Sequence, residues 1–314
     1  MVDGKRVAVV IPAYNEEKLV GATVAGIPEF VDRIYVVDDC STDGTVEAVR
    51  RLADPRLALI EHERNAGVGA AIVSGYKRAI EERIDVTAVM AADNQMPPAD
   101  LITLVEPVAL GEVDYAKANR LFTGKAWDEI PHYRYLGNAI LSLLTKIASG
   151  YWHIADSQSG YTAISLDMLD KLDLDRIYPR YGMPNDMLVH LNIWNARVRD
   201  FPSNPVYGVG EQSGIKLRVV VPTISILLLK AFWWRMKEKY VIRDFHPLVF
   251  FYALGVLMTT VGGILGVIVT VSRIVGGNQI TTATVVLVAL LLIAGTQFTL
   301  FAMLFDKEES EKLR

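Results

Sequence analysis

Two long segments without a charged residue lie near the C-terminus and constrain this chain more than any other feature. The first runs from Leu248 to Ser272 over 25 residues, and the second from Ile280 to Phe305 over 26 residues. About 20 apolar residues are enough for a helix to cross a bilayer. We therefore predict an integral membrane protein with a transmembrane hairpin over residues 246–306, whose spans cover about 248–272 and 280–305, and the lipid bilayer as one partner.

The charges beside these segments predict their orientation. Residues 235–243 and the charged tail 307–314 are rich in Lys and Arg, whereas the connecting loop 273–279 has one basic residue. The positive-inside tendency places both flanks in the cytoplasm and the loop outside. The N-terminus shows no signal peptide, because the apolar run Val7–Pro12 is too short, so we expect the domain of residues 1–218 to be cytoplasmic.

The region between the domain and the hairpin is basic and partly apolar. From Gly214 to Arg243 there are seven basic residues against one acid, Glu238. Anionic lipid headgroups attract such a cluster. The apolar stretch Val219–Trp234 is short for a span, so we predict an amphipathic interfacial helix region over 219–245. A third membrane span over this stretch is the alternative. It is the weaker one because it would place four basic residues outside, against the positive-inside tendency.

The first two hundred residues alternate β-type and helical patterns. Apolar, β-branched runs end near residues 12, 38, 60 and 90, and the first three are each followed by helical spacing. This alternation predicts βαβ units, a mainly parallel sheet and right-handed crossovers, which together make an α/β, Rossmann-like fold. Further strands are expected at 114–118, 160–165 and 198–201. One cysteine, Cys40, excludes an internal disulfide framework.

Polar motifs follow the first four predicted strands. They are Pro12-Ala13-Tyr14-Asn15-Glu16, Asp38-Asp39, the glycine-rich Asn65–Gly69, and Asp93-Asn94-Gln95. Parallel strands end at one edge of a sheet, which is the usual ligand position in this architecture. Each motif alone also fits a simpler explanation, such as a helix cap, a solvated turn or an Asx turn. Together they predict a ligand site.

The fourth motif predicts a metal ion. Asp93 and Gln95 are two residues apart, so an extended backbone would point both side chains the same way. Their oxygens suit Mg²⁺ or Mn²⁺ when the ion also holds a phosphate. Pro97 and Pro98 are expected to start a helix. The glycine-rich loop suits close approach to a phosphate, although it is neither GxGxxG nor a P-loop.

As a set, these motifs resemble the family 2 glycosyltransferases of the GT-A nucleotide-sugar-binding fold, and most of all the dolichol-phosphate mannose synthases and polyprenyl-phosphate glycosyltransferases. The resemblance covers roughly residues 5–218. It rests on Ile11–Glu16, Val37–Asp43, Asn65–Ala70, Ala92–Pro98, Asn119-Arg120, Tyr133-Arg134 and Ser159-Gly160.

The resemblance implies a role for each matching residue. The nucleotide sugar would contact Pro12, Ala13, Tyr14, Glu16, Asp38, Asp39, Gly67, Ala92, Asp93 and Lys216. A divalent cation, Mn²⁺ or Mg²⁺, would bind Asp93 and Gln95. The phosphate of a lipid acceptor would bind Arg120, Arg134, Asn138 and Arg218, since Arg makes planar, charge-assisted hydrogen bonds. The catalytic set would be Asp93, Arg120, Arg134 and Asp186.

The chain departs from the family pattern in three places. Relatives usually carry Asp-Ala-Asp before the metal site, whereas this chain has Ala91-Ala92-Asp93. The segment Gly210–Lys216 matches the family's closing loop only loosely. The Gln-x-x-Arg-Trp motif of processive synthases is missing from the sequence, which argues against a polymer-making enzyme.

These observations predict a membrane-bound, inverting, metal-dependent glycosyltransferase. It would move a hexose, with mannose from GDP-mannose favoured, to dolichyl or polyprenyl phosphate. An ionised phosphate needs no general base. Asp186 is therefore either a helix cap or the base of an enzyme that extends a lipid-linked glycan.

Four alternatives stay open beside that one. They are a UDP-glucose-using polyprenyl-phosphate glucosyltransferase, a nucleotidyltransferase, a non-catalytic nucleotide-sugar sensor and a channel. The nucleotidyltransferase ranks low because a Gly-x-Gly-Thr-Arg type loop is missing after the first strand. The channel ranks low because the spans carry no charge. No nucleic-acid partner is expected.

Overall fold

The computed structural model describes residues 1–121, 132–204, 217–276 and 279–314, with the backbone alone for 132–139 and 217–220. The chain forms two compact units. The first comprises Met1–Arg235 together with Lys312–Arg314, and the second comprises Met236–Glu311. The first unit therefore continues past the predicted boundary at residue 218.

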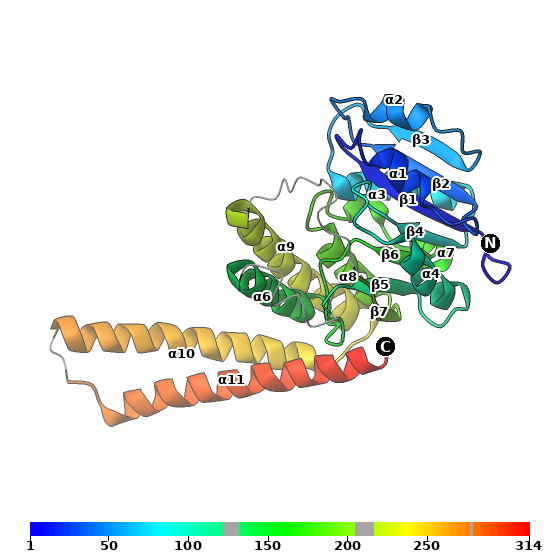
Figure 1. Cartoon of the computed structure of the whole chain (residues 1–314). Helices are drawn as coiled ribbons and strands as arrows, with labels where there is room; N and C mark the ends of the chain where they lie inside the picture. The colour runs from blue at the N-terminus through cyan, green and yellow to red at the C-terminus, as the bar shows by residue number, and fades with distance from the viewer. Residues whose placement is uncertain (122–131, 205–216, 277–278) are drawn as a thin grey trace. The chain divides into compact units, whose positions relative to one another are not determined.

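The first unit is built on a seven-stranded sheet with the order β3-β2-β1-β4-β6-β5-β7 (Figure 1). Strands β1 to β4 pair in parallel, β6 runs antiparallel to both β4 and β5, and β5 pairs in parallel with β7. All strands of this sheet except β6 therefore end at one edge, which we call the carboxyl edge. The predicted mainly parallel α/β sheet is confirmed. The strands are β1 (Val7–Ala13), β2 (Arg33–Asp38), β3 (Leu57–Glu61), β4 (Val86–Val89), β5 (Tyr115–Asn119), β6 (Thr162–Ser165) and β7 (Val198–Pro202).

Helices cover both faces of the sheet. Side chains alternate along a strand, so Val7, Val9 and Ile11 of β1 join one core while Ala8 and Val10 join the other. The first core takes its helical residues from α1 (Val20–Ala25), α2 (Thr45–Arg50) and α4 (Leu101–Ala109). The second takes them mainly from α3 (Val68–Glu81), α7 (Leu166–Lys171) and α8 (Met183–Ile193). A 3₁₀ turn over Pro98–Asp100 leads into α4, so the predicted helix start at the prolines is confirmed.

A buried arginine joins three helices of the first unit. Arg235, near the end of α9 (Leu217–Lys237), has no exposed surface. Its guanidinium donates to the Ile147 carbonyl in α6 (His132–Ser149) at 3.1 Å and to Asn192 Oδ1 in α8 at 3.3 Å. In the second unit Lys239 is also buried. The prediction of a headgroup-facing basic cluster is therefore wrong for these two residues, because both are enclosed by the protein.

The second unit contains the two apolar helices, α10 (Leu248–Gly276) and α11 (Thr282–Glu311). Among the described helices, these two are long and apolar enough to cross a membrane. They approach closely at two glycines, because a Cβ on Gly255 would lie 3.0 Å from the Gly295 carbonyl and the reverse distance is the same. Small residues at such contacts are typical of packed membrane helices. Near the base of the hairpin, the buried Tyr240 hydroxyl donates to Asp306 Oδ1 at 2.8 Å.

The last residues of the chain belong to the first unit. Helix α11 runs on to Glu311, so most of the predicted charged tail is helical. Leu313 is then buried in the core under α3, α7 and α8, and its carbonyl accepts a hydrogen bond from Val198 N at 3.0 Å.

Substitution of Gly150 tests how tightly the buried Arg235 is packed. The φ of Gly150 is +76°, and a Cβ there would overlap the Arg235 guanidinium. The matched control is Gly111, whose φ is +71° and whose Cβ would meet nothing within 4 Å. We expect Gly111→Ala to cost about 1 kcal/mol through its backbone conformation, and Gly150→Ala roughly 1–3 kcal/mol more through overpacking. The readout is the thermal unfolding midpoint in detergent, and equal shifts would contradict the prediction.

Candidate active site

The loops that follow β1 and β2 hold each other at the carboxyl edge. Asn15 has a φ of +58°, which asparagine tolerates, and its Oδ1 accepts a hydrogen bond from Thr42 N at 2.8 Å. Glu16 N donates to Thr45 Oγ1 at 2.9 Å. The side chain of Tyr14, the residue before Asn15, is exposed. The first two predicted motifs are therefore brought together.

Asp38 offers a hydrogen-bond acceptor at this place. The residue is buried, and its Oδ2 accepts a hydrogen bond from Ser41 N at 3.0 Å. Its Oδ1 is also buried and has no hydrogen-bond partner among the described residues. An unsatisfied buried carboxylate oxygen is costly, so the position suits a ligand that brings an N–H or O–H group. A nucleoside has such groups.

Asp39 has a different task. Its Oδ1 accepts hydrogen bonds from Ala66 N and its Oδ2 from Gly67 N, at 2.8 and 2.7 Å. His62 Nδ1 lies 2.8 Å from Oδ1, and His62 Nε2 lies 2.8 Å from Ser74 Oγ. The carboxylate therefore anchors the glycine-rich loop to β2. His62 was not predicted, although it lies directly after β3, and a position directly after a strand is the signal that singled out the other motifs.

The glycines of that loop allow close packing. A Cβ on Gly67 would lie 2.5 Å from the Pro179 carbonyl, and one on Gly69 would lie 2.5 Å from the Tyr178 carbonyl. Ala70 N donates to the Pro179 carbonyl at 3.0 Å. The start of α3 is thus covered by the segment before α8. This contact occupies one side of the loop, and the predicted close approach of a phosphate to it stays a prediction.

The segment after β4 is a turn. Asn94 has a φ of +56°, and Gln95 N donates to Asp93 Oδ1 at 3.1 Å, as in an Asx turn. The prediction that Asp93 and Gln95 share one side of an extended strand is wrong, because β4 ends at Val89. The Asx turn considered beside it is correct.

Two hydroxyl groups fix this turn. Thr23 Oγ1 in α1 donates to the Ala92 carbonyl at 3.1 Å, and the Tyr161 hydroxyl donates to the Pro97 carbonyl at 2.9 Å. Tyr161 precedes β6, whose reversed direction places its start at the carboxyl edge. The turn with Asp93 is therefore held from both sides.

The acids at this edge have the chemistry for a divalent cation. Burial, followed by the charges of Asp93 and Asp43, raises the pKa of Glu16. A cation would relieve this crowding of carboxylates. The described residues hold no group of three or more His, Cys, Asp or Glu side chains placed to bind a metal. Mg²⁺ in phosphate-transfer sites often takes one or two carboxylates together with substrate phosphates, so Asp93 fits as such a ligand.

The structure describes the side chains of only some of the residues predicted to bind the acceptor phosphate. Arg120 follows β5 at the carboxyl edge, and its Nε and Nη2 donate to Asp156 at 2.7 and 3.1 Å. Asp156 was not predicted. Arg134 and Asn138 lie on α6 and Arg218 on α9, but their side chains are outside the described residues, as is Lys216 altogether.

Asp186 is buried in the first turn of α8. Its Oδ2 accepts a hydrogen bond from Tyr178 N at 2.8 Å and lies 3.5 Å from His190 Nε2. The helix-cap prediction is wrong, because Gly182 occupies the N-cap. A general base has to reach its substrate, and this carboxylate instead holds the segment that covers α3.

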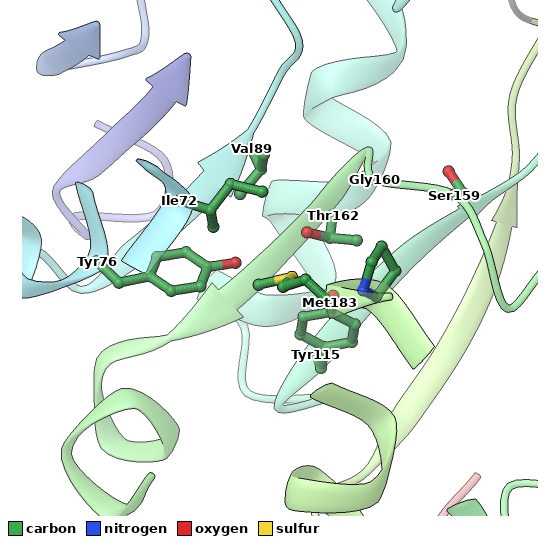
Figure 2. Close-up of a pocket in the computed structure, with 9 residues that line it drawn as sticks. Ile72, Tyr76, Val89, Tyr115, Ser159, Gly160, Thr162 and Met183 are labelled. Carbon is green, nitrogen blue, oxygen red and sulfur yellow. The ribbon is translucent and has the colours of Figure 1, made fainter. Parts of the chain in front are cut away.

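A pocket with about 200 Å³ of space, part of it open to solvent, lies between the sheet, α3 and the start of α8 (Figure 2). Figure 2 shows the Tyr76 hydroxyl pointing into it toward Thr162, opposite Met183. Burial raises the pKa of Tyr115, which also lines it, to about 12. The lining is mostly apolar and comes largely from the core under α3 and α8. We therefore assign the pocket to the core.

Comparison with known proteins decides the family. Residues 8–173, more than half of the 314, match the family model described as Glycosyl transferase family 2. The chain belongs to this family. The fold and family predicted from the motifs are confirmed, and the protein is a glycosyltransferase.

Two curated relatives resemble this glycosyltransferase over most of their length. The UDP-N-acetylglucosamine–dolichyl-phosphate N-acetylglucosaminyltransferase of Methanococcus voltae is 29% identical, over 65% of this chain and 86% of that protein. The undecaprenyl-phosphate mannosyltransferase of Micrococcus luteus is 30% identical, over 74% of this chain and 98% of that protein.

A solved structure shares the fold. Glucosyl-3-phosphoglycerate synthase from Mycobacterium tuberculosis, in complex with Mn²⁺, uridine diphosphate and glucosyl-3-phosphoglycerate, has a TM-score of 0.53. The match covers 74% of this chain and 80% of that one, at 18% sequence identity.

Replacing Asp39 tests its role as loop anchor. In Asp39→Asn one oxygen remains, so a buried N–H of Ala66 or Gly67 would face an amide N–H group. We expect a loss of about 1–3 kcal/mol in unfolding free energy. The control Asp43→Asn changes a carboxylate in the neighbouring loop that does not bind the glycine-rich loop. A larger loss for the control, measured by thermal unfolding, would contradict the anchor role.

Proposed function

We propose that this glycosyltransferase moves a hexose from a nucleotide sugar to the phosphate of a dolichyl or polyprenyl lipid at the cytoplasmic membrane surface. The observation that carries the proposal is the common carboxyl edge, where the Asp93 turn and Arg120 both lie. A donor diphosphate with its cation and an anionic acceptor need these two kinds of groups side by side. The relatives from Methanococcus voltae and Micrococcus luteus are named for transfer to such lipids.

Each residue has one task in this reaction. Asp38 Oδ1 and Tyr14 receive the nucleoside. Asp93, with Gln95 beside it, holds the divalent cation, which supplies charge stabilisation for the departing diphosphate. Arg120 orients the acceptor phosphate toward the anomeric carbon, together with Arg134 and Asn138. The acceptor oxygen is already ionised, so the buried position of Asp186 is no obstacle. A single direct attack inverts the anomeric configuration.

The surface of the first unit favours a lipid substrate. One side of α9 packs inward through Ile224, Leu228 and Phe232. The other exposes large apolar side chains, as does α6; they are Ile226, Leu229 and Trp233 in α9, and Ile140 and Leu143 in α6. Apolar side chains of this size are typical of a helix that lies in the membrane interface. The hairpin then anchors the enzyme to the bilayer that contains its acceptor.

The favoured donor is GDP-mannose. Mannosyl transfer is named for the Micrococcus luteus relative, which this chain matches over 98% of its length. The second candidate is UDP-N-acetylglucosamine, because the Methanococcus voltae relative is named for it.

A transfer assay in detergent tests the function. GDP-mannose, UDP-N-acetylglucosamine and UDP-glucose are offered separately with dolichyl phosphate and Mn²⁺, Mg²⁺ or a chelator. We expect product with one hexose donor, no product with chelator, and a loss of at least about 100-fold in Asp93→Ala. The control Asp167→Ala removes an exposed carboxylate of α7 and should retain the rate. Transfer to a lipid-linked glycan but not to lipid phosphate would refute the proposal.

A labelling experiment tests the orientation. Cys40 is the one cysteine of the chain, so Cys40→Ser gives a background without thiols. In that background Gln279→Cys, in the loop between the spans, should react with an impermeant maleimide on intact cells. Lys307→Cys should react after permeabilisation alone. The reverse pattern would place the catalytic domain outside.

A further inference from the structure

Asp156 holds Arg120 in one orientation. Its carboxylate accepts hydrogen bonds from Nε and Nη2 of the guanidinium and, at 3.2 Å, from the backbone N–H of Arg120. The Asp156 side chain is 4% exposed, whereas that of Arg120 is 41% exposed. The carboxylate thus lies inside the protein, and the arginine reaches solvent at the carboxyl edge.

The loop that carries Asp156 is fixed at both ends by the sheet. Lys117 of β5 and Asp200 of β7 are cross-strand neighbours. Asp200 Oδ2 accepts a hydrogen bond from Ala155 N at 2.6 Å, and Lys117 Nζ donates to the Ser159 carbonyl. Two charged residues within the sheet therefore anchor the beginning and the end of the 155–159 loop.

Burying these charges is costly. Burial lowers the pKa of Lys117 to about 8 and raises that of Asp200 to about 6. Burial also works against the charge of Asp156, but the hydrogen bonds and charge of Arg120 outweigh it and lower the pKa. Well-packed apolar residues would often serve stability equally well, so a buried charge network invites a functional explanation.

We propose that Asp156, on the loop held by Lys117 and Asp200, is a positioning residue that presets the Arg120 guanidinium for the acceptor phosphate. This inference rests on the proposed function. A side chain that is already ordered loses less conformational freedom when the phosphate binds. Hydrogen bonds from both Nε and Nη2 to one carboxylate fix the plane of the guanidinium, and planar orientation governs how an arginine meets a phosphate.

A double-mutant cycle separates positioning from general stability. The variants are Asp156→Asn, Arg120→Ala and the double variant, and the probe is citronellyl phosphate binding to the full chain in detergent. We expect Asp156→Asn to weaken binding about tenfold and the double variant to bind no more weakly than Arg120→Ala. Additive losses would overturn the proposal. If Asp156→Asn does not fold, Asp156→Glu completes the same cycle, and it should also weaken binding.

The chain offers a matched control at the opposite edge. Asp114 accepts hydrogen bonds from Arg197 N, Nε and Nη2 at 2.7, 3.2 and 2.9 Å, so the same three donor atoms bind the carboxylate as in the pair Asp156 and Arg120. Asp114 directly precedes β5, and Arg197 directly precedes β7. Asp114→Asn should lower the unfolding midpoint and leave citronellyl phosphate affinity unchanged. An equal loss of affinity in Asp114→Asn would show that Asp156 acts only through general stability, and would overturn the positioning role.

Binding and transfer are measured separately. Nucleoside diphosphate affinity should stay within about twofold in Asp156→Asn, since the donor binds at the other strands. Wild-type protein that binds citronellyl phosphate but transfers no hexose would refute the proposed function alone. Wild-type protein that does not bind it would overturn both.

Discussion

The reversed direction of β6 is the constraint on which the site depends. Because β6 runs antiparallel between β4 and β5, β5 is parallel to β4 and ends at the same edge. The Asp93 turn and Arg120 both lie at the carboxyl edge for that reason. The same reversal brings the segment before β6 to this edge. That segment contributes Asp156, which holds Arg120, and Tyr161, which holds the Asp93 turn. One strand thus connects the two halves of the site.

The site is built by buried polar groups rather than by exposed loops alone. Asp39 satisfies the backbone of the glycine-rich loop, and Asp156 satisfies Arg120. Each carboxylate replaces water with fixed donors, which compensates for its burial and holds a loop in one conformation. Asp38 departs from this rule, because its Oδ1 is buried without a hydrogen-bond partner among the described residues, and we propose that a nucleoside supplies that partner.

The sequence predicted the elements whose signal is local. The first four strands, the helix after Pro98 and both apolar helices follow from periodicity and composition. Contacts between distant residues carried no such signal. Asp156 lies 36 residues from Arg120, and Arg235 lies 88 residues from the Ile147 carbonyl. The turn at Asp93 was misjudged because Asn94 adopts a positive φ, which period-two reasoning about strands does not take into account.

Charge divides the two halves of the sheet in a way that suits their expected ligands. The half with β1 and β2 buries the carboxylates Asp38 and Asp39, which favour donor groups and cations. In the half with β5 and β7, Lys117 and Arg120 balance Asp156 and Asp200, and the buried Arg235, which donates a hydrogen bond to α6, adds a further cation. A nucleoside and a divalent cation would meet a complementary electrostatic field in the first half of the sheet. An anionic phosphate would meet one in the second half. If the half with β5 and β7 receives the acceptor, as we propose, its buried charges have a use that a purely structural core would lack.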